Sequence, residues 1–138
     1  MAAINMNIGA SFMRFTFTDG EGEIFASFRI NPADVKLAAR FGEASKFFND
    51  LGGRMNNAAT IADFEKLNDE LEDKICYLLG YDAKNSLFGQ ISATTIMEDG
   101  NMFATHIMNV LAKNVGPEIA KRKQAMAAAV EKHTAKYQ

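Results

Sequence analysis

Two runs of alternating residues, joined by a glycine-rich acidic turn, constrain the fold of this chain most. Apolar and polar side chains alternate in residues 13–18, and the sequence DGEG follows this run. In residues 24–30 a second run places Ile24, Ala26, Phe28 and Ile30 on one face, in alternation with Phe25, Ser27 and Arg29. A period of two is typical of half-buried strands, and such a turn predicts a β-hairpin. Because an isolated hairpin is barely stable in water, its phenylalanine-rich face must pack against helices or another subunit.

The segment NPADVKLAARFGEASKFFNDLGG predicts the first helix. We expect Asn31 to cap it, with Pro32 at the first helical position. Gly52 and Gly53 are a natural stop, so the polar RMNNAA that follows is expected to be a loop. The expected buried stripe consists of Val35, Ala38, Ala39, Gly42, Ser45, Phe48 and Leu51.

The segment TIADFEKLNDELEDKICYLLG predicts the clearest helix of the chain. Thr60 and Asp63 have the spacing of a capping box, and Gly80 is expected to end the helix. Asp82 is then expected to cap a short helix that runs to Phe88. Spacings of three and four predict one apolar face along the longer helix, made of Ile61, Phe64, Leu67, Leu71, Ile75 and Leu78.

A last helix is predicted in GNMFATHIMNVLAKNV, with Gly116 and Pro117 interrupting or ending it. The order of elements predicts an α+β fold, mostly α, with an N-terminal β-hairpin followed by four to five helices. We expect residues 1–116 to form a single domain and residues 117–138 to form a basic, alanine-rich C-terminal helix or tail. This tail has a thin apolar stripe, so it is expected to be exposed, to pair with a partner or to fray.

Composition narrows the functional classes. The 138 residues carry a formal net charge of -2, which gives no overall bias toward nucleic acid or an anionic membrane. No apolar stretch approaches the roughly 20 residues that span a bilayer, and the N-terminus lacks the pattern of a signal peptide. With a single cysteine and no pair of cysteines for a disulfide, we expect a soluble protein of the cytoplasm.

Three side chains are candidates for reactive groups: Cys76, His106 and His133. Cys76 falls in the last turns of an acidic helix, where a thiolate is disfavoured, and we expect it to be a small packed side chain. His106 and His133 lie far apart and lack the spacing of metal ligands. We therefore expect no catalytic residue, no metal site and no cofactor.

Charge is distributed unevenly along the chain. Residues 60–82 contain seven acidic groups against two basic ones, whereas residues 113–138 contain six basic groups against two acidic ones. Solvated helix faces explain this pattern, and so does electrostatic complementarity between copies or with a partner. Nucleic-acid binding is the weaker alternative, because no aromatic residue is interleaved with the basic cluster of Lys121, Arg122 and Lys123.

The order of a hairpin, a helix entered through NPADVKLAARF, the corner LEDKICYLLGYDAKNSLFG and the later GNMFATHIMNVLAKNV resembles a known family. It is similar to the small tail assembly chaperones of long-tailed phages and prophages of Gram-positive bacteria. In those proteins an acidic helix often leads to a corner like LLGYDAKNSLFG, and the likeness covers about residues 22–116. The phenylalanine-rich hairpin departs from the family pattern, so the resemblance assigns no role to any single residue.

The resemblance implies a non-enzymatic protein that binds the tape measure protein and keeps it soluble until tail-tube subunits polymerise around it. Such families often also make a longer, frameshifted form. We expect a homo-oligomer whose flexible apolar side chains contact the partner. The alternatives are a structural subunit of a virion or other assembly and a small nucleic-acid-associated or regulatory protein. The candidate partner-binding residues are Phe12, Phe25, Met97, Met102, Met108 and Met126.

Overall fold

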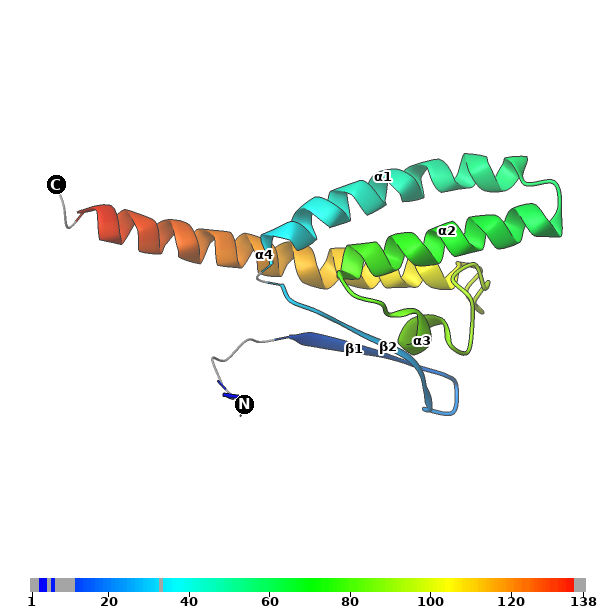
Figure 1. The fold of residues 1–138 in the computed structure, drawn as a ribbon, viewed down its shortest axis with the longest axis horizontal. Coiled ribbons are helices and arrows are strands. Elements are labelled where there is room, and N and C mark those ends of the chain that lie inside the picture. The colour runs from blue at the N-terminus through cyan, green and yellow to red at the C-terminus, as the bar shows by residue number, and fades with distance from the viewer. Residues whose placement is uncertain (1–2, 5, 7–11, 33, 136–138) are drawn as a thin grey trace.

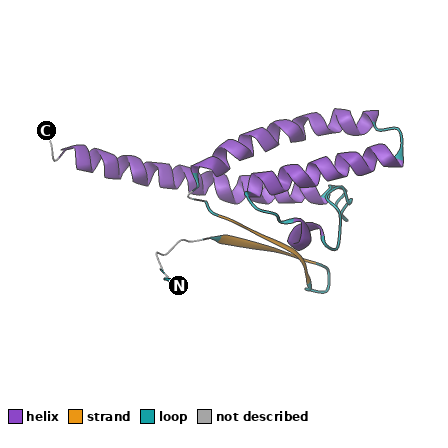
Figure 2. Cartoon of the chain, in the orientation of Figure 1, coloured by secondary structure: helices purple, strands orange, loops and turns teal. Residues whose placement is uncertain are grey.

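The structure is a computed structural model that describes residues 3–4, 6, 12–32 and 34–135, the last range without the side chains of residues 118, 119, 122 and 133–135. Strands β1 (Met13–Thr18) and β2 (Ile24–Ile30) precede the helices α1 (Val35–Asn57), α2 (Ile61–Leu79), α3 (Lys84–Phe88) and α4 (Phe103–Ala135). Figure 2 shows this division into an N-terminal hairpin and a helical remainder, which confirms the predicted α+β fold.

The helices and the hairpin enclose one core. In Figure 1, α1 and α2 run side by side in opposite directions, and the first half of α4 lies beside α2 on the side of the hairpin. The short α3 lies between α2 and the hairpin. The second half of α4 extends away from all other elements, toward the C-terminus.

The predicted hairpin is present, with its aromatic face inward. β1 and β2 pair antiparallel, and the register places Phe15 opposite Phe28, whose rings stack with centroids 4.9 Å apart. The turn closes through Gly22, whose φ of 82° is a conformation that favours glycine. On β2 the inward residues Ala26, Phe28 and Ile30 are buried, so the hairpin is one wall of the core.

Helix α1 differs from its prediction at both ends. Asp34, and not Asn31, is the N-cap, and its carboxylate accepts a hydrogen bond from the Lys36 backbone N–H. The helix also continues through Gly52 and Gly53 into the expected loop and ends at Asn57. A glycine inside a helix costs only about 1 kcal/mol relative to alanine, and burial of neighbouring side chains outweighs that cost.

The buried stripe of α1 is shifted from the predicted one. Leu37, Ala44 and Leu51 are buried, whereas Val35 is 73% exposed. The spacing of seven residues between these buried positions keeps them on one side of the helix. The predicted stripe is right at Leu51 and wrong at Val35. Alanine, serine and glycine fit either side of a helix, so they did not determine its phase.

Helix α2 follows its prediction closely. The Thr60 hydroxyl accepts from the Asp63 backbone N–H, the Asp63 carboxylate accepts from the Thr60 backbone N–H, and Gly80 ends the helix with a φ of 84°. Leu67, Leu71, Ile75 and Leu78 are buried as predicted. The first turn departs from the prediction, since Ile61 is 80% exposed and Phe64 is 41% exposed. Both lie at the end of α2 that projects beyond the core.

Two polar residues of α2 hold the segment that leads into α4. The Asn68 side chain accepts from the backbone N–H and the hydroxyl of Thr94, and the Glu72 carboxylate accepts from the Ala93 backbone N–H. Asn68 also donates to Glu72 at 2.8 Å, which fixes both side chains. These bonds place residues 91–102 against the body and so position the first turn of α4.

Helix α4 continues through the predicted stop. Gly116 and Pro117 lie inside one helix from Phe103 to Ala135, so the expectation that they interrupt or end it was wrong. Proline removes the hydrogen bond to the carbonyl of residue 113. Lys113 and Pro117 are both exposed, so water can satisfy that carbonyl. We call residues 116–135 of α4 the arm.

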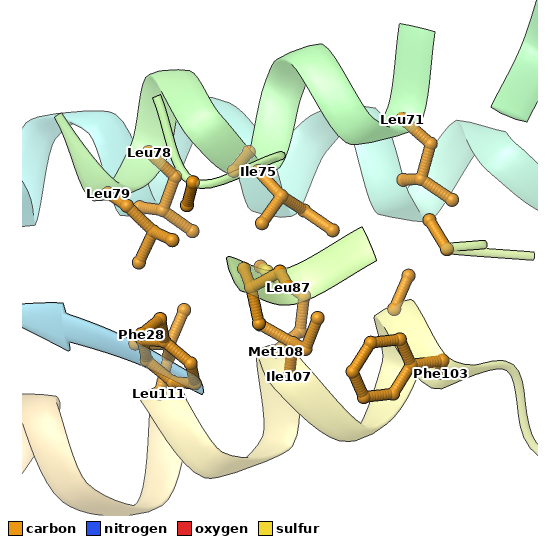
Figure 3. Close-up of a cluster of buried hydrophobic side chains, with 14 of the residues drawn as sticks. Phe28, Leu71, Ile75, Leu78, Leu79, Leu87, Phe103, Ile107, Met108 and Leu111 are labelled. Carbon is orange, nitrogen blue, oxygen red and sulfur yellow. The ribbon is translucent and has the colours of Figure 1, made fainter. Parts of the chain in front are cut away.

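The core fills the space between α2, α3, β2 and the first half of α4 (Figure 3). Leu78 and Leu79 of α2 face Leu111 of α4 across it, with Phe28 of β2 at the same end. Leu87 of α3 is completely buried in the middle. No described side-chain nitrogen or oxygen that is buried lacks a hydrogen-bond partner.

Candidate functional site

A hollow of about 610 Å³ lies between the hairpin turn and the first turn of α4. This space, called the hollow below, is the candidate site. Apolar side chains form its floor, and carboxylates form its rim. Its walls come from the hairpin, from the segment before α4 and from α4 itself. The lining residues are Phe17, Thr18, Asp19, Gly20, Phe25, Ile91, Met97, Glu98, Asp99, Phe103 and His106.

Aromatic rings form the floor of the hollow. The Phe17 ring meets the Phe103 ring edge to face with centroids 5.1 Å apart, and Phe25 lies tilted against Phe103 at 5.7 Å. Phe103 itself is buried, whereas Phe25 and Met97 are half-buried. Insertion of a few apolar side chains of a ligand into this space would bury the remaining exposed surface of Phe25 and Met97.

The rim of the hollow is acidic. Asp19 lies in the hairpin turn, where its carboxylate accepts from the backbone N–H groups of Glu21 and Glu23 at 2.9 and 3.0 Å. Asp99 and Glu98 lie in the turn before α4, which contains Gly100 with a φ of 86°. The described residues of the lining include no lysine or arginine, so three carboxylates face one imidazole there.

Asp99 is held in its ionised form. Its carboxylate accepts from the Asn101 backbone N–H at 3.0 Å and lies 2.9 Å from Nε2 of His106. The Asn101 backbone hydrogen bond, followed by the His106 and Asn101 side chains, lowers the pKa of Asp99 to about 2. The rim therefore keeps this negative charge at any physiological pH.

The arm offers the opposite chemistry at the other end of α4. All its described side chains are exposed, including Lys121, Lys123 and Lys132. Met126 and Val130 are each 60% exposed although both are apolar. Lys121 and Lys123 of the predicted basic cluster thus lie in solvent, and the Arg122 side chain lies outside the described residues.

The predicted partner-binding residues do not form one surface. Phe25 and Met97 come together in the hollow, and Met102 is half-buried in the segment that leads from it into α4. Met108 is buried in the core and Met126 is on the arm. The remaining residue, Phe12, is 49% exposed and lies away from the hollow, with the Arg29 guanidinium carbon 5.8 Å from its ring centroid.

Cys76 has the surroundings of a packed side chain. It is half-buried against the core at the end of α2, and burial is the main cause that raises its pKa, with the Asp82 charge adding to it. Both effects favour the neutral thiol, which is the weaker nucleophile. His106 contacts Asp99, as described above, and the His133 side chain lies outside the described residues.

Sequence reasoning missed the acidic rim. From the sequence alone, DGEG is assigned to a turn, and Glu98 and Asp99 are not singled out. A usable signal was present, because DGEG and EDGN are both acidic, glycine-containing turns that flank apolar segments. Only the fold shows that the two turns lie at the edge of the same hollow.

Comparisons with known proteins identify no relatives: no family model matches the chain, and neither a curated protein nor a solved structure matches it. In the part of the chain that the structure describes, no helix has the length and apolar character needed to cross a membrane. Within the same residues, no three histidine, cysteine, aspartate or glutamate side chains come together as a possible metal site.

Proposed function

We propose that this protein is a non-enzymatic phage tail assembly chaperone that binds the tape measure protein during tail morphogenesis in the host cytoplasm. The observation that supports this proposal most is the hollow, where Phe25, Met97 and Phe103 form an apolar floor beside the charged rim. The resemblance carried by LLGYDAKNSLFG adds the identity of the partner.

The hollow suits an amphipathic helix as its ligand. Helices that bind grooves insert apolar side chains spaced three and four residues apart, and a space of about 610 Å³ has room for several of them. Met97 contributes a flexible, polarizable wall that adapts to different apolar sequences. The carboxylates of Asp19, Glu98 and Asp99 favour lysine or arginine beside the inserted side chains.

A chaperone for a long helical protein needs this combination. It must cover apolar stripes of varied sequence, and it must release them when tail-tube subunits arrive. A small apolar floor with a charged rim binds through few anchors, so dissociation stays fast enough for displacement.

The test is co-expression of the protein with the tape measure protein, followed by measurement of how much tape measure protein stays soluble and co-purifies. Met97→Asp places a charge on the apolar floor, and we expect it to weaken binding at least about tenfold. Ile96→Asp is the matched control, because Ile96 is the neighbouring residue, is 60% exposed and does not line the hollow.

Four outcomes would contradict the proposal or its assignment to the hollow. Absence of association and of any gain in solubility rules out the chaperone function. Polymerisation of the protein alone into tubes or sheets supports the structural-subunit alternative, and salt-dependent binding to DNA or RNA supports the nucleic-acid alternative. Equal loss of binding in Met97→Asp and Ile96→Asp would move the binding surface away from the hollow.

A further inference from the structure

We propose that the arm of one copy docks into the hollow of a second copy, so that the protein associates with itself through the two ends of α4. The two surfaces carry opposite charge, and each leaves described apolar side chains exposed. Self-association through the arm is independent of the proposed function, because it needs no partner other than this chain.

The arm extends the stripe with which α4 contacts the core. Among the described side chains of α4, Val115 is the last buried one, with 2% exposure. Met126 follows eleven residues later, which is close to three helical turns, so it lies on the same side of the helix as Val115. Val130 follows at a spacing of four. The stripe that is buried up to Val115 therefore continues as exposed apolar surface.

The charges of the two surfaces are complementary. The arm contains four basic residues and two acidic ones, and Lys121, Lys123 and Lys132 are exposed. Among the residues that the structure describes, the rim of the hollow carries Asp19, Glu98 and Asp99 and neither lysine nor arginine. Lys123 lies three residues before Met126 and therefore next to the apolar stripe, whereas Lys121 and Lys132 lie farther around the arm. A basic arm with an apolar stripe thus matches an apolar floor beside carboxylates.

The arm of the same copy is too far away to fill this hollow. His106 lines the hollow in the first turn of α4, and Met126 lies twenty residues along the same continuous helix. At 1.5 Å per residue, about 30 Å separates the two positions. In this structure the arm also points away from the hairpin (Figure 1). Only the arm of another copy can reach.

The geometry favours a reciprocal pair. One arm in one hollow is a small contact, whereas two such contacts related by a two-fold axis double the buried area and close the assembly. Without that symmetry the same contact would propagate as an open chain. In either case the hollow is covered until a stronger ligand displaces the arm.

The first experiment measures the mass of the full-length protein against concentration, by sedimentation or light scattering. We expect the wild type to associate reversibly, and we expect Met126→Asp to raise the dissociation constant at least about tenfold. Gln124→Asp is the matched control: it adds the same charge two residues earlier, on the opposite side of the arm. A wild type that is monomeric at every concentration, or equal effects of the two variants, would overturn the proposal.

The second experiment locates the contact by cross-linking. In a Cys76→Ala background, Met126→Cys chains are mixed with Met97→Cys chains that carry a tag of different size, and the mixture is oxidised. We expect a disulfide-linked dimer of mixed size, and much less of it when Gln124→Cys replaces Met126→Cys. A mixed dimer that forms equally with both cysteines contradicts docking of the Met126 side in the hollow.

Failure of this proposal is distinguishable from failure of the proposed function. Met126→Asp leaves the hollow intact. If this variant is as oligomeric as the wild type and still solubilises the tape measure protein, the result contradicts the arm contact and leaves the proposed function standing. Conversely, oligomers that depend on the arm, together with no binding of the tape measure protein, contradict the chaperone function and leave the arm contact standing.

Discussion

From Phe103 to Val115, α4 turns a buried side chain toward the core every three or four residues, whereas the arm that continues the same helix buries none of its described side chains. The first half is held by packing against α2, α3 and the hairpin. The arm depends on its backbone hydrogen bonds and on the helix propensity of its alanines, since none of its described side chains is buried. One continuous helix thus contains a part that tertiary packing fixes and a part that local preference must maintain.

The largest expected difference between the two halves is in stability. Leu111 is completely buried in the first half and Met126 is 60% exposed on the arm. We expect Leu111→Ala to lower the free energy of unfolding by about 2–5 kcal/mol, because it leaves a cavity. Met126→Ala should change it by less than about 0.5 kcal/mol. Urea denaturation at low protein concentration measures both, and similar values would contradict the contrast.

Pro117 tests where the packed half ends. Replacement by alanine restores the missing N–H and removes a clash that costs about 3 kcal/mol inside a helix. We expect Pro117→Ala to slow hydrogen exchange of arm amides and to leave the exchange of core amides in α2 unchanged. If exchange slows equally in α2, the arm and the core unfold as one unit and the division at Val115 is wrong.

The smallest effect concerns the first turn of α4, where Asp99 contacts His106. The pKa of Asp99 is lowered to about 2, so its ionised form stabilises the folded state above the ordinary value of 3.8, and this contribution is lost as the pH falls toward 2. We expect Asp99→Asn to lower the thermal midpoint at pH 6, and the difference from wild type to shrink as the pH falls from 4 to 2. A constant difference across that range would contradict the role of the charge.

Local chemistry was enough to predict several elements. The hairpin follows from its alternation and its glycine turn, and α2 follows from the capping box of Thr60 and Asp63 and from the stop at Gly80. These signals act within a few residues, so the sequence contains all of the interaction that they describe. Two residues of the hollow, Phe25 and Met97, were also predicted as partner-binding candidates.

One error occurred where distant contacts outweigh local preference. Gly52 and Gly53 are breakers by propensity, yet α1 continues through them. In α1 the continuation is held from outside the helix, because Met55 packs against the core and Arg54 pairs with Glu70 of α2. The acidic rim of the hollow could not be predicted, because Asp19 and Asp99 lie 80 positions apart in the sequence.

The sequence by itself determined which segments are strands and helices, where α2 begins and ends, and that the C-terminal segment is basic with a thin apolar stripe. The tertiary structure decided which side of α1 is buried, how far α1 continues, and which turns meet at the hollow. The physical reason is range. Caps, turns and periodicity are interactions between neighbours in the chain, whereas burial and the grouping of charges depend on segments that only folding brings together.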